Sequence, residues 1–167
     1  NWQKDLGKFG GTANSFKFKS SVRETDIVID FGCGGGYLLA ELTAETKIGI
    51  EPNINAHPEI LSNGAKVFSN SSDALDQLGH DYADVILSNN ALEHCLHPYD
   101  DLKNLFHILK PTGKIHFLVP CDQPEYKWVS NSRDYHLYSW SQMNIGNLFT
   151  EVGFTKIDVK INNIKWP

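Results

Sequence analysis

Several features that define large classes of proteins are scarce in this chain. Its three cysteines, at positions 33, 95 and 121, are too few and odd in number for a disulfide scaffold, and they suit a reducing cytoplasm. No apolar run approaches the roughly 18 residues of a membrane span, and no secretory signal is visible. The net charge is −5 and no basic run exceeds two residues, which argues against a broad nucleic-acid surface. We therefore expect a cytoplasmic protein with no membrane span and no nucleic-acid partner.

The remaining composition is that of an ordinary globular protein. The chain has 167 residues, of which 41% are hydrophobic and 21% charged, enough for one α/β domain with a sizeable core. It contains no repeats and no low-complexity segments. It begins with Asn1 rather than Met and stops at Pro167 without an obvious terminal element, so we expect a fragment or a trimmed chain.

The most informative segment is 26–40, which reads Asp-Ile-Val-Ile-Asp-Phe-Gly-Cys-Gly-Gly-Gly-Tyr-Leu-Leu-Ala. Its β-branched apolar start predicts a strand buried on both faces, and the residues after the glycines predict a helix. Gly32, Gly34 and Gly36 carry no side chains, so a ligand can approach the backbone of the turn. The amino end of the helix offers free N–H groups. The segment therefore predicts a site for a nucleotide-like ligand.

The pattern of glycines distinguishes between two kinds of nucleotide. A dinucleotide fingerprint requires Gly-x-Gly-x-x-Gly, and the sixth position here is Tyr37. The run from Asp30 through Gly36 instead resembles the first motif of class I S-adenosylmethionine-dependent methyltransferases. The second landmark of that family is an acidic residue at the end of the next strand, which Glu51 supplies 19 positions after Gly32. A carboxylate in that place can accept hydrogen bonds from both ribose hydroxyls.

Hydrophobic periodicity and turn residues predict alternating strands and helices. This alternation indicates an α/β fold with a doubly wound, mostly parallel sheet and helices on both faces, a three-layer Rossmann-like arrangement. Residues 1–25, which are rich in glycine and then aromatic, are expected to form a loop with at most one short helix. The predicted strands cover 27–29, 47–51, 65–68, 84–87, 114–119 and 154–161, and the predicted helices 37–43, 55–62, 73–78, 98–109 and a stretch from a serine cap at 139 or 141 to 152.

The resemblance extends over residues 26–161, with further matches at 82–94, 109–114 and 148–154. We expect one domain, in which 26–167 bind S-adenosylmethionine and the segment 1–25 forms a lid or loop. Family members usually add a seventh, antiparallel strand, for which this chain has no room. The strand over 114–119 would then have an exposed edge, be covered by the strand over 154–161, or pair with a partner such as a second copy of the chain.

The resemblance implies contacts with the methionine and ribose of S-adenosylmethionine and of its product S-adenosylhomocysteine. Asp30 is expected to face the methionine amino group, although it could instead brace the loop. The three glycines would form the floor of the site, and Glu51 would bind the ribose. Cys33 belongs to the same loop, and we expect its side chain to be packed rather than nucleophilic, because nothing nearby in the sequence would lower its pKa.

Four residues are candidates for the adenine pocket. Pro52 and Asn53 follow Glu51 and are expected to edge the pocket. Asn70 occupies the place where many relatives have an aspartate that accepts the adenine amino group. Ser71 could offer its backbone N–H to a ring nitrogen.

The polar residues after the strand over 84–87 are expected to face the reacting groups. The backbone of Asn89 would lie near the methionyl portion, and Asn90 would point toward the acceptor, although both also suit a polar turn. Glu93-His94 resembles a common Leu-Glu-His step of the family, which binds a divalent metal in some carboxylate-rich relatives. Because Asn90 replaces the upstream carboxylate, and the histidines and cysteine over 94–97 match no zinc pattern, we predict no metal.

Residues 120–139 form a long polar and aromatic insertion that holds, among others, Tyr126, Arg133 and His136. It follows a strand at its carboxyl end, where ligands bind in open α/β sheets, so it can roof the acceptor site. His136 is the candidate general base because neutral imidazole is available near pH 7, and the alternative is an ordinary packing histidine.

The resemblance implies methyl transfer from S-adenosylmethionine to an oxygen or nitrogen of a small or medium acceptor. The segments 10–16 and 136–140 also resemble stand-alone bacterial methyltransferases of glycan and surface-polysaccharide pathways, which suggests a glycan-type acceptor. Two alternatives stay open: a non-catalytic or incomplete S-adenosylmethionine-binding module, and an NAD(P)-dependent oxidoreductase or epimerase.

Overall fold

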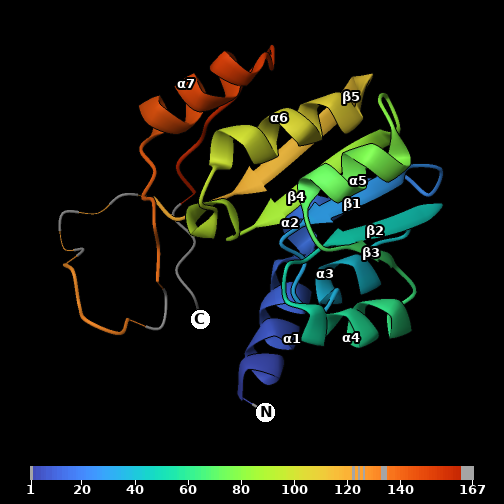
Figure 1. Ribbon diagram of the computed structural model, residues 1–167, viewed down its shortest axis with the longest axis horizontal. Coiled ribbons are helices and arrows are strands. Elements are labelled where there is room, and N and C mark those ends of the chain that lie inside the picture. The colour runs from blue at the N-terminus through green and yellow to red at the C-terminus, as the bar shows by residue number, and fades with distance from the viewer. Residues whose placement is uncertain (1, 122, 124, 126, 133–134, 163–167) are drawn as a thin grey trace.

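A computed structural model describes residues 2–162 except 122, 124, 126, 133 and 134. Five parallel strands form one sheet in the order β3-β2-β1-β4-β5 (Figure 1). The predicted α/β, Rossmann-like fold is confirmed, and the described residues contain no antiparallel strand. The strands are β1 (Ile27–Phe31), β2 (Thr46–Ile50), β3 (Lys66–Phe68), β4 (Ala83–Asn89) and β5 (Leu109–Leu118).

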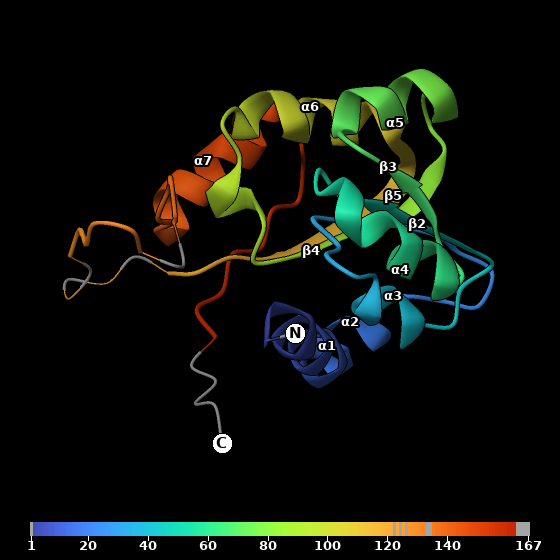
Figure 2. The ribbon, with the colours of Figure 1, turned by 60° about the horizontal axis from the view of Figure 1, so that its bottom comes forward.

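Helices cover both faces of the sheet, as Figure 2 shows from the side. α1 to α4 lie on one face, and α5, α6 and α7 lie on the other. No helix in this part of the chain is long and apolar enough to span a membrane. The helices are α1 (Trp2–Asn14), α2 (Phe16–Lys19), α3 (Tyr37–Ala40), α4 (His57–Ser62), α5 (Ser71–Leu78), α6 (Pro98–Ile108) and α7 (Gln142–Val152), with short 3-10 turns η1 (Ile54–Ala56) and η2 (Leu92–His94).

The apolar strand residues divide into two cores because successive side chains point to opposite faces of a sheet. Val28 packs on the face of α3 and α4 with Leu39 and Ile60. Its neighbour Ile29 packs on the other face with residues of α6 such as Leu105. β1 is thus buried on both sides, as its β-branched composition predicts.

The boundaries of α7 follow local signals in the sequence. The side chain of Ser141 accepts a hydrogen bond from the backbone of Asn144, whose own side chain bonds back to the cap, forming a capping box. Gly153 ends the helix in the left-handed conformation. The predicted cap at Ser141 and the predicted stop at Gly153 are both confirmed.

The prediction of a loop with at most one short helix over residues 1–25 is wrong. α1 covers 13 residues, and of its glycines Gly11 serves close packing rather than a turn. A Cβ added to Gly11 would lie 2.8 Å from the Cβ of Tyr37 and 2.9 Å from the backbone nitrogen of Leu38. α1 therefore lies directly against the start of α3, at the end of the glycine turn.

The predicted strand over 154–161 is also absent. These residues run beside the sheet without forming a ladder, although Ile157, Val159 and Ile161 alternate as in a strand. Lys156 adopts a positive φ of 56°, which interrupts the extended conformation near its start. β5 is consequently the last strand of the sheet, and no described strand pairs with its outer edge.

We predict opposite effects for two alanine substitutions in α1. Alanine generally stabilises a helix by about 0.5–1 kcal/mol relative to glycine. Gly10→Ala should show this gain, since a Cβ there meets nothing within 4 Å. Gly11→Ala should instead lower the free energy of unfolding by about 1–3 kcal/mol, because α1 must move off α3. Urea unfolding of both variants checks this, and an equal gain at both sites would show that α1 does not pack there.

Candidate functional site

The glycine turn between β1 and α3 needs conformations that other residues avoid. Gly32, Gly34 and Gly36 all have positive φ, of 73°, 54° and 75°. Gly32 also lies against Ala91, into which an added Cβ would project, and its N–H donates to the carbonyl of Ile50 at 2.8 Å. The turn therefore packs between the ends of β2 and β4, and its open position is Gly34, where an added Cβ would meet nothing within 4 Å.

Glu51 fastens the turn to the end of β2. One carboxylate oxygen accepts a hydrogen bond from the N–H of Gly34 at 2.8 Å, and the other accepts one from the N–H of Asn53 at 2.9 Å. A carboxylate has about four acceptor positions, so each oxygen keeps one for a ligand. Glu51 thus lies where the sequence places it, beside the glycines, and has a bracing role that the sequence did not reveal.

Asp30 is a buried carboxyl group at this edge of the sheet. Its side chain is 2% exposed, and its Oδ1 atom has no hydrogen-bond partner among the described residues. Burial, together with the nearby charge of Glu51, raises the pKa of Asp30 from 3.8 to about 8. A ligand that brings a positive charge would relieve this cost.

Cys33 is buried beneath the same turn. Burial and the neighbouring charge of Asp30 raise the pKa of its thiol far above the ordinary value. The side chain therefore stays an uncharged, packed thiol.

The candidates for an adenine pocket follow β2 and β3. Pro52 and Asn53 are exposed, and the Asn53 side chain caps η1. Asn70 caps α5: its oxygen accepts from the N–H of Asp73 at 2.8 Å, and its amide donates to the Asp73 carboxylate. The oxygen predicted to accept from adenine thus already has one donor.

Ser71 is held by side chains of α6 rather than by the predicted ligand side. Its hydroxyl donates to the Asp101 carboxylate at 2.6 Å and accepts from the Asn104 amide at 3.0 Å. The backbone N–H of Ser71 is left for the role that the sequence assigned to it.

The residues after β4 lie next to the glycine turn. Asn90 has a positive φ of 55°, and its N–H donates to Leu118 at the end of β5. The next residues form η2, which carries Glu93 and His94. The predicted polar turn is present, and it places Asn89 and Asn90 at the carboxyl edge of the sheet.

The end of the insertion is fastened onto η2. The N–H groups of Leu137 and Tyr138 both donate to the carbonyl of Glu93, at 2.8 and 3.2 Å. The Tyr138 hydroxyl donates to Leu96, also at 3.2 Å. These bonds bring His136 beside Glu93, with 4.0 Å between Nε2 and Oε1. Tyr126 and Arg133 of the insertion lie outside the described residues.

Glu93 was not predicted as a site residue, yet it is the second buried carboxylate at this edge. It is 1% exposed, neither of its oxygens has a hydrogen-bond partner among the described residues, and burial raises its pKa. Local sequence gives no signal for this burial, because it depends on residues 43 positions further along the chain.

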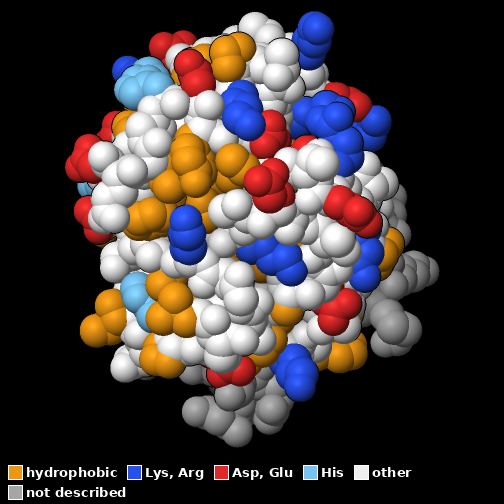
Figure 3. Space-filling view, turned by 90° about the vertical axis from the view of Figure 1, so that its right-hand side faces the viewer, with side chains coloured by type: hydrophobic (Ala, Val, Ile, Leu, Met, Phe, Trp, Pro, Cys, Tyr) orange, Lys and Arg blue, Asp and Glu red, His pale blue; other side chains and the backbone are white. Residues whose placement is uncertain are grey.

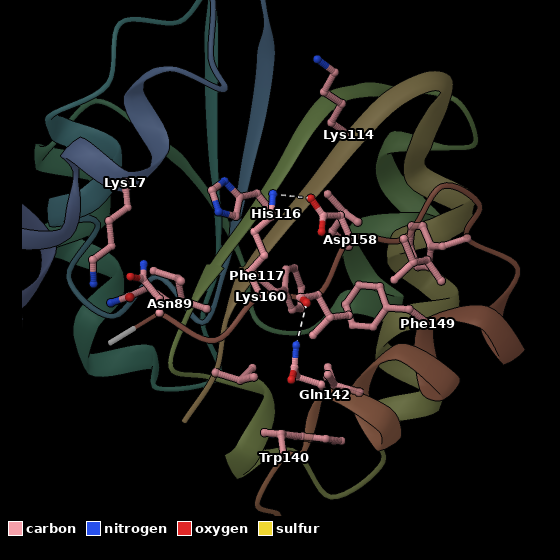
Figure 4. A pocket seen from close by; sticks show the side chains of 18 of the residues that line it. Lys17, Asn89, Lys114, His116, Phe117, Trp140, Gln142, Phe149, Asp158 and Lys160 are labelled. Atoms are coloured by element: carbon pink, nitrogen blue, oxygen red, sulfur yellow. Dashed lines mark hydrogen bonds and ion pairs between the residues drawn. The ribbon is translucent and has the colours of Figure 1, made fainter. Parts of the chain in front are cut away.

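A cavity of about 1360 Å³ lies beside the outer edge of β5 (Figure 4). Asn89 and Asn90 line one end of it, but Asp30, Glu51 and the glycine turn do not. His116 and Lys17 both line it, and burial lowers the pKa of both groups. The cavity therefore meets the predicted site only at its acceptor side.

The opposite end of the sheet, where the strands begin, carries polar groups that are paired with one another: Asp84 accepts from the N–H of Ile27 at 2.9 Å and lies 2.7 Å from the Nζ atom of Lys110. Figure 3 shows lysines, arginines and carboxylates interspersed with hydrophobic side chains, without a broad field of one sign. The buried, unpartnered carboxylates are found at the other end, where β1 and β4 finish.

We predict that Asp30 makes stability fall with rising pH in the absence of ligand. Asp30 ionises near 3.8 in the unfolded chain and near about 8 in the folded protein, so between these values the folded state alone keeps the proton. Asp30→Asn should remove this slope. Near pH 8 its free energy of unfolding should exceed that of wild type by on the order of a few kcal/mol, since one pKa unit is about 1.4 kcal/mol. Unfolding measured from pH 4 to 8 checks it. Asp76→Asn, an exposed change, should keep the wild-type slope, and an unchanged slope in Asp30→Asn would contradict the assignment.

Comparisons with known proteins identify the family of the chain. A family model described as a methyltransferase domain matches residues 11–159. No curated protein matches the chain significantly.

Solved structures share the fold at low sequence identity. A Thermotoga maritima protein named as an S-adenosylmethionine-dependent methyltransferase is 17% identical, with 90% of this chain and 74% of that one covered and a TM-score of 0.71. A complex of the Haloferax volcanii Trm112 methyltransferase activator with a candidate methyltransferase is also similar. The identity is 16%, the match covers 93% of this chain and 83% of that one, and the TM-score is 0.67. The [4+2]-cyclase SpnF is 17% identical, with 95% of this chain and 61% of that one covered and a TM-score of 0.69. From the family match and the glycine turn, the chain belongs to the methyltransferase-domain family and is an S-adenosylmethionine-dependent methyltransferase.

Proposed function

We propose that the protein transfers the methyl group of S-adenosylmethionine to an oxygen or nitrogen of a small or medium acceptor, with S-adenosylhomocysteine as the product. The observation that carries this proposal is the pairing of the buried Asp30, whose Oδ1 atom has no hydrogen-bond partner among the described residues, with a glycine turn braced by Glu51. S-adenosylmethionine is already activated, so the protein has mainly to align it with the acceptor.

The two carboxylates bind opposite ends of the cofactor in this proposal. The methionine ammonium group is the positively charged partner that Asp30 lacks in the free protein. The ribose hydroxyls donate to the free acceptor positions of Glu51. Gly32, Gly34 and Gly36, with the backbone of Cys33, form the floor between them.

The remaining candidates surround the base and the methyl group. Pro52, Asn53, Asn70 and the N–H of Ser71 border the adenine. The backbone of Asn89 lies near the methionyl portion, and Asn90 faces the acceptor. α1, packed against the start of α3, covers the cofactor as a lid.

The acceptor lies on the side of η2 and the insertion. His136 is the proton acceptor when the nucleophile is a protonated hydroxyl or amine, and its side chain remains 30% exposed for that contact. The Tyr138 ring, which is 38% exposed and stacks at 5.5 Å on the buried Trp140, offers an aromatic surface next to it. A glycan-type acceptor is the class that the sequence resemblances favour.

We predict that S-adenosylhomocysteine binds and that Glu51→Gln weakens binding by about 1.5–3 kcal/mol, because the variant loses hydrogen bonds from a charged group. Calorimetric titration measures this, with NADH as the ligand control and Glu45→Gln, an exposed change before β2, as the matched variant. Equal affinity in Glu51→Gln and wild type, or tighter binding of NADH, would contradict the proposal.

One alternative is a module that binds the cofactor without transferring a methyl group. The observation that favours it is the open edge of β5, which leaves the sheet with five strands. Isotope-labelled S-adenosylmethionine separates the two, since only an enzyme passes label to an acceptor. An NAD(P)-dependent enzyme is disfavoured by the family match and by Tyr37, which replaces the glycine of its fingerprint.

The same edge is where we propose that a second copy of the chain could pair. A dimer of this kind would bring Lys114 and His116 of β5 to the interface. Charged residues at a sheet edge oppose such pairing, so the dimer should be weak and depend on protein concentration.

A further inference from the structure

We propose that Glu93, His94 and His136 form a binding site for a divalent transition-metal ion. One ligand atom of each residue lies within 4.8 Å of the others. The Oε1 atom of Glu93 is 3.9 Å from Nε2 of His94 and 4.0 Å from Nε2 of His136. The sequence predicted no metal, because Asn90 replaces the upstream carboxylate and the spacing over 94–97 matches no zinc pattern; the structure adds His136 to Glu93 and His94.

The buried carboxylate of Glu93 is the first reason to place a cation here. Both of its oxygens lack hydrogen-bond partners among the described residues, although the residue is 1% exposed. A carboxylate buried without a partner is costly. The two histidine nitrogens, at 3.9 and 4.0 Å, are too distant for direct hydrogen bonds, and this spacing leaves room for an ion between the three groups.

The orientation of His94 is the second reason. Its Nδ1 atom lies 3.3 Å from the carbonyl oxygen of Tyr135. A carbonyl can only accept, so Nδ1 carries the hydrogen and, in the neutral ring, Nε2 presents a lone pair toward Glu93. Histidines that bind metals are commonly held in this way, with the other ring nitrogen donating to a carbonyl.

The spacing also fits an ion at ordinary bond lengths. Zinc lies about 2.0–2.2 Å from imidazole nitrogen and carboxylate oxygen, so its ligand atoms stand roughly 3–4 Å apart. The cluster needs only a small contraction to reach that geometry. The two N–H groups that donate to the Glu93 carbonyl already hold the segment with His136 in place.

The ligand types indicate which ions would bind. Two imidazoles and one carboxylate suit Zn²⁺, Mn²⁺, Fe²⁺ or Co²⁺, whereas Mg²⁺ and Ca²⁺ prefer oxygen ligands. His94 and His136 are 45% and 30% exposed, so further coordination positions face outward.

The ion would lie on the acceptor side of the site. η2 follows Ala91, which contacts the glycine turn at Gly32. A bound ion could there orient an acceptor oxygen and favour the loss of its proton, with His136 acting as a ligand in place of a general base. Only this catalytic consequence rests on the proposed function; binding of the ion does not.

Titration with Co²⁺ and Zn²⁺ after treatment with a chelator tests the site. We expect one strong equivalent, and a Co²⁺ spectrum without sulfur charge-transfer bands, since the cluster has no thiolate. Glu93→Gln and His136→Ala should each weaken binding by at least about 100-fold, the upper end of the loss seen when only residues behind metal ligands are changed. His80→Ala should bind like wild type, because His80 precedes β4 and so lies at the other end of that strand.

Controls keep a negative result informative. His136→Ala changes a partly exposed side chain of the insertion, so its thermal unfolding in the absence of metal should match wild type. Binding that survives both Glu93→Gln and His136→Ala, or no binding by folded wild type, would overturn the proposal. Titration of the same samples with S-adenosylhomocysteine separates this outcome from a failure of the proposed function.

Discussion

The central position of β1 determines where everything else lies. β1 pairs in parallel with β2 on one side and β4 on the other, and its apolar side chains supply both cores. Because its neighbours run in the same direction, the loops after the three strands leave the sheet at one edge. Asp30 and Glu51 lie there for this reason, and Glu93 follows on η2, where the end of the insertion bonds to its carbonyl. A shift of one residue in the register would turn Asp30 to the other face and separate these groups.

Features with a local cause could be predicted from the sequence. The glycine turn depends on backbone conformations that few other residues adopt, and the cap at Ser141 depends on residues three positions apart. α1 could not be predicted in this way, since glycines usually interrupt helices. Here Gly11 allows a neighbouring helix to approach, which is a tertiary effect. The false strand over 154–161 has the right alternation but no partner strand.

The same distinction applies to the site. Glu51 lies beside the glycine turn as the motif spacing indicates, but its hydrogen bonds to Gly34 and Asn53 follow from the fold. The proximity of Glu93 to His136 is a contact across 43 positions that no periodicity in the sequence encodes. Asn70 shows the converse, because a residue chosen for a ligand role also serves as the cap of α5.

The insertion is fixed at its two ends. At its base, the backbone of Cys121 forms an isolated parallel β-bridge with that of Trp140. The backbone N–H groups of residues 137 and 138 donate to the carbonyl of Glu93. Lengthening a loop between fixed ends is inexpensive, about 0.6 kcal/mol for each doubling of a flexible one. The stretch between these anchors can therefore be exchanged or extended with little disturbance to the cofactor side. If the insertion contacts the acceptor as proposed, evolution or engineering could change the acceptor preference by replacing this stretch while the cofactor-binding residues stay the same.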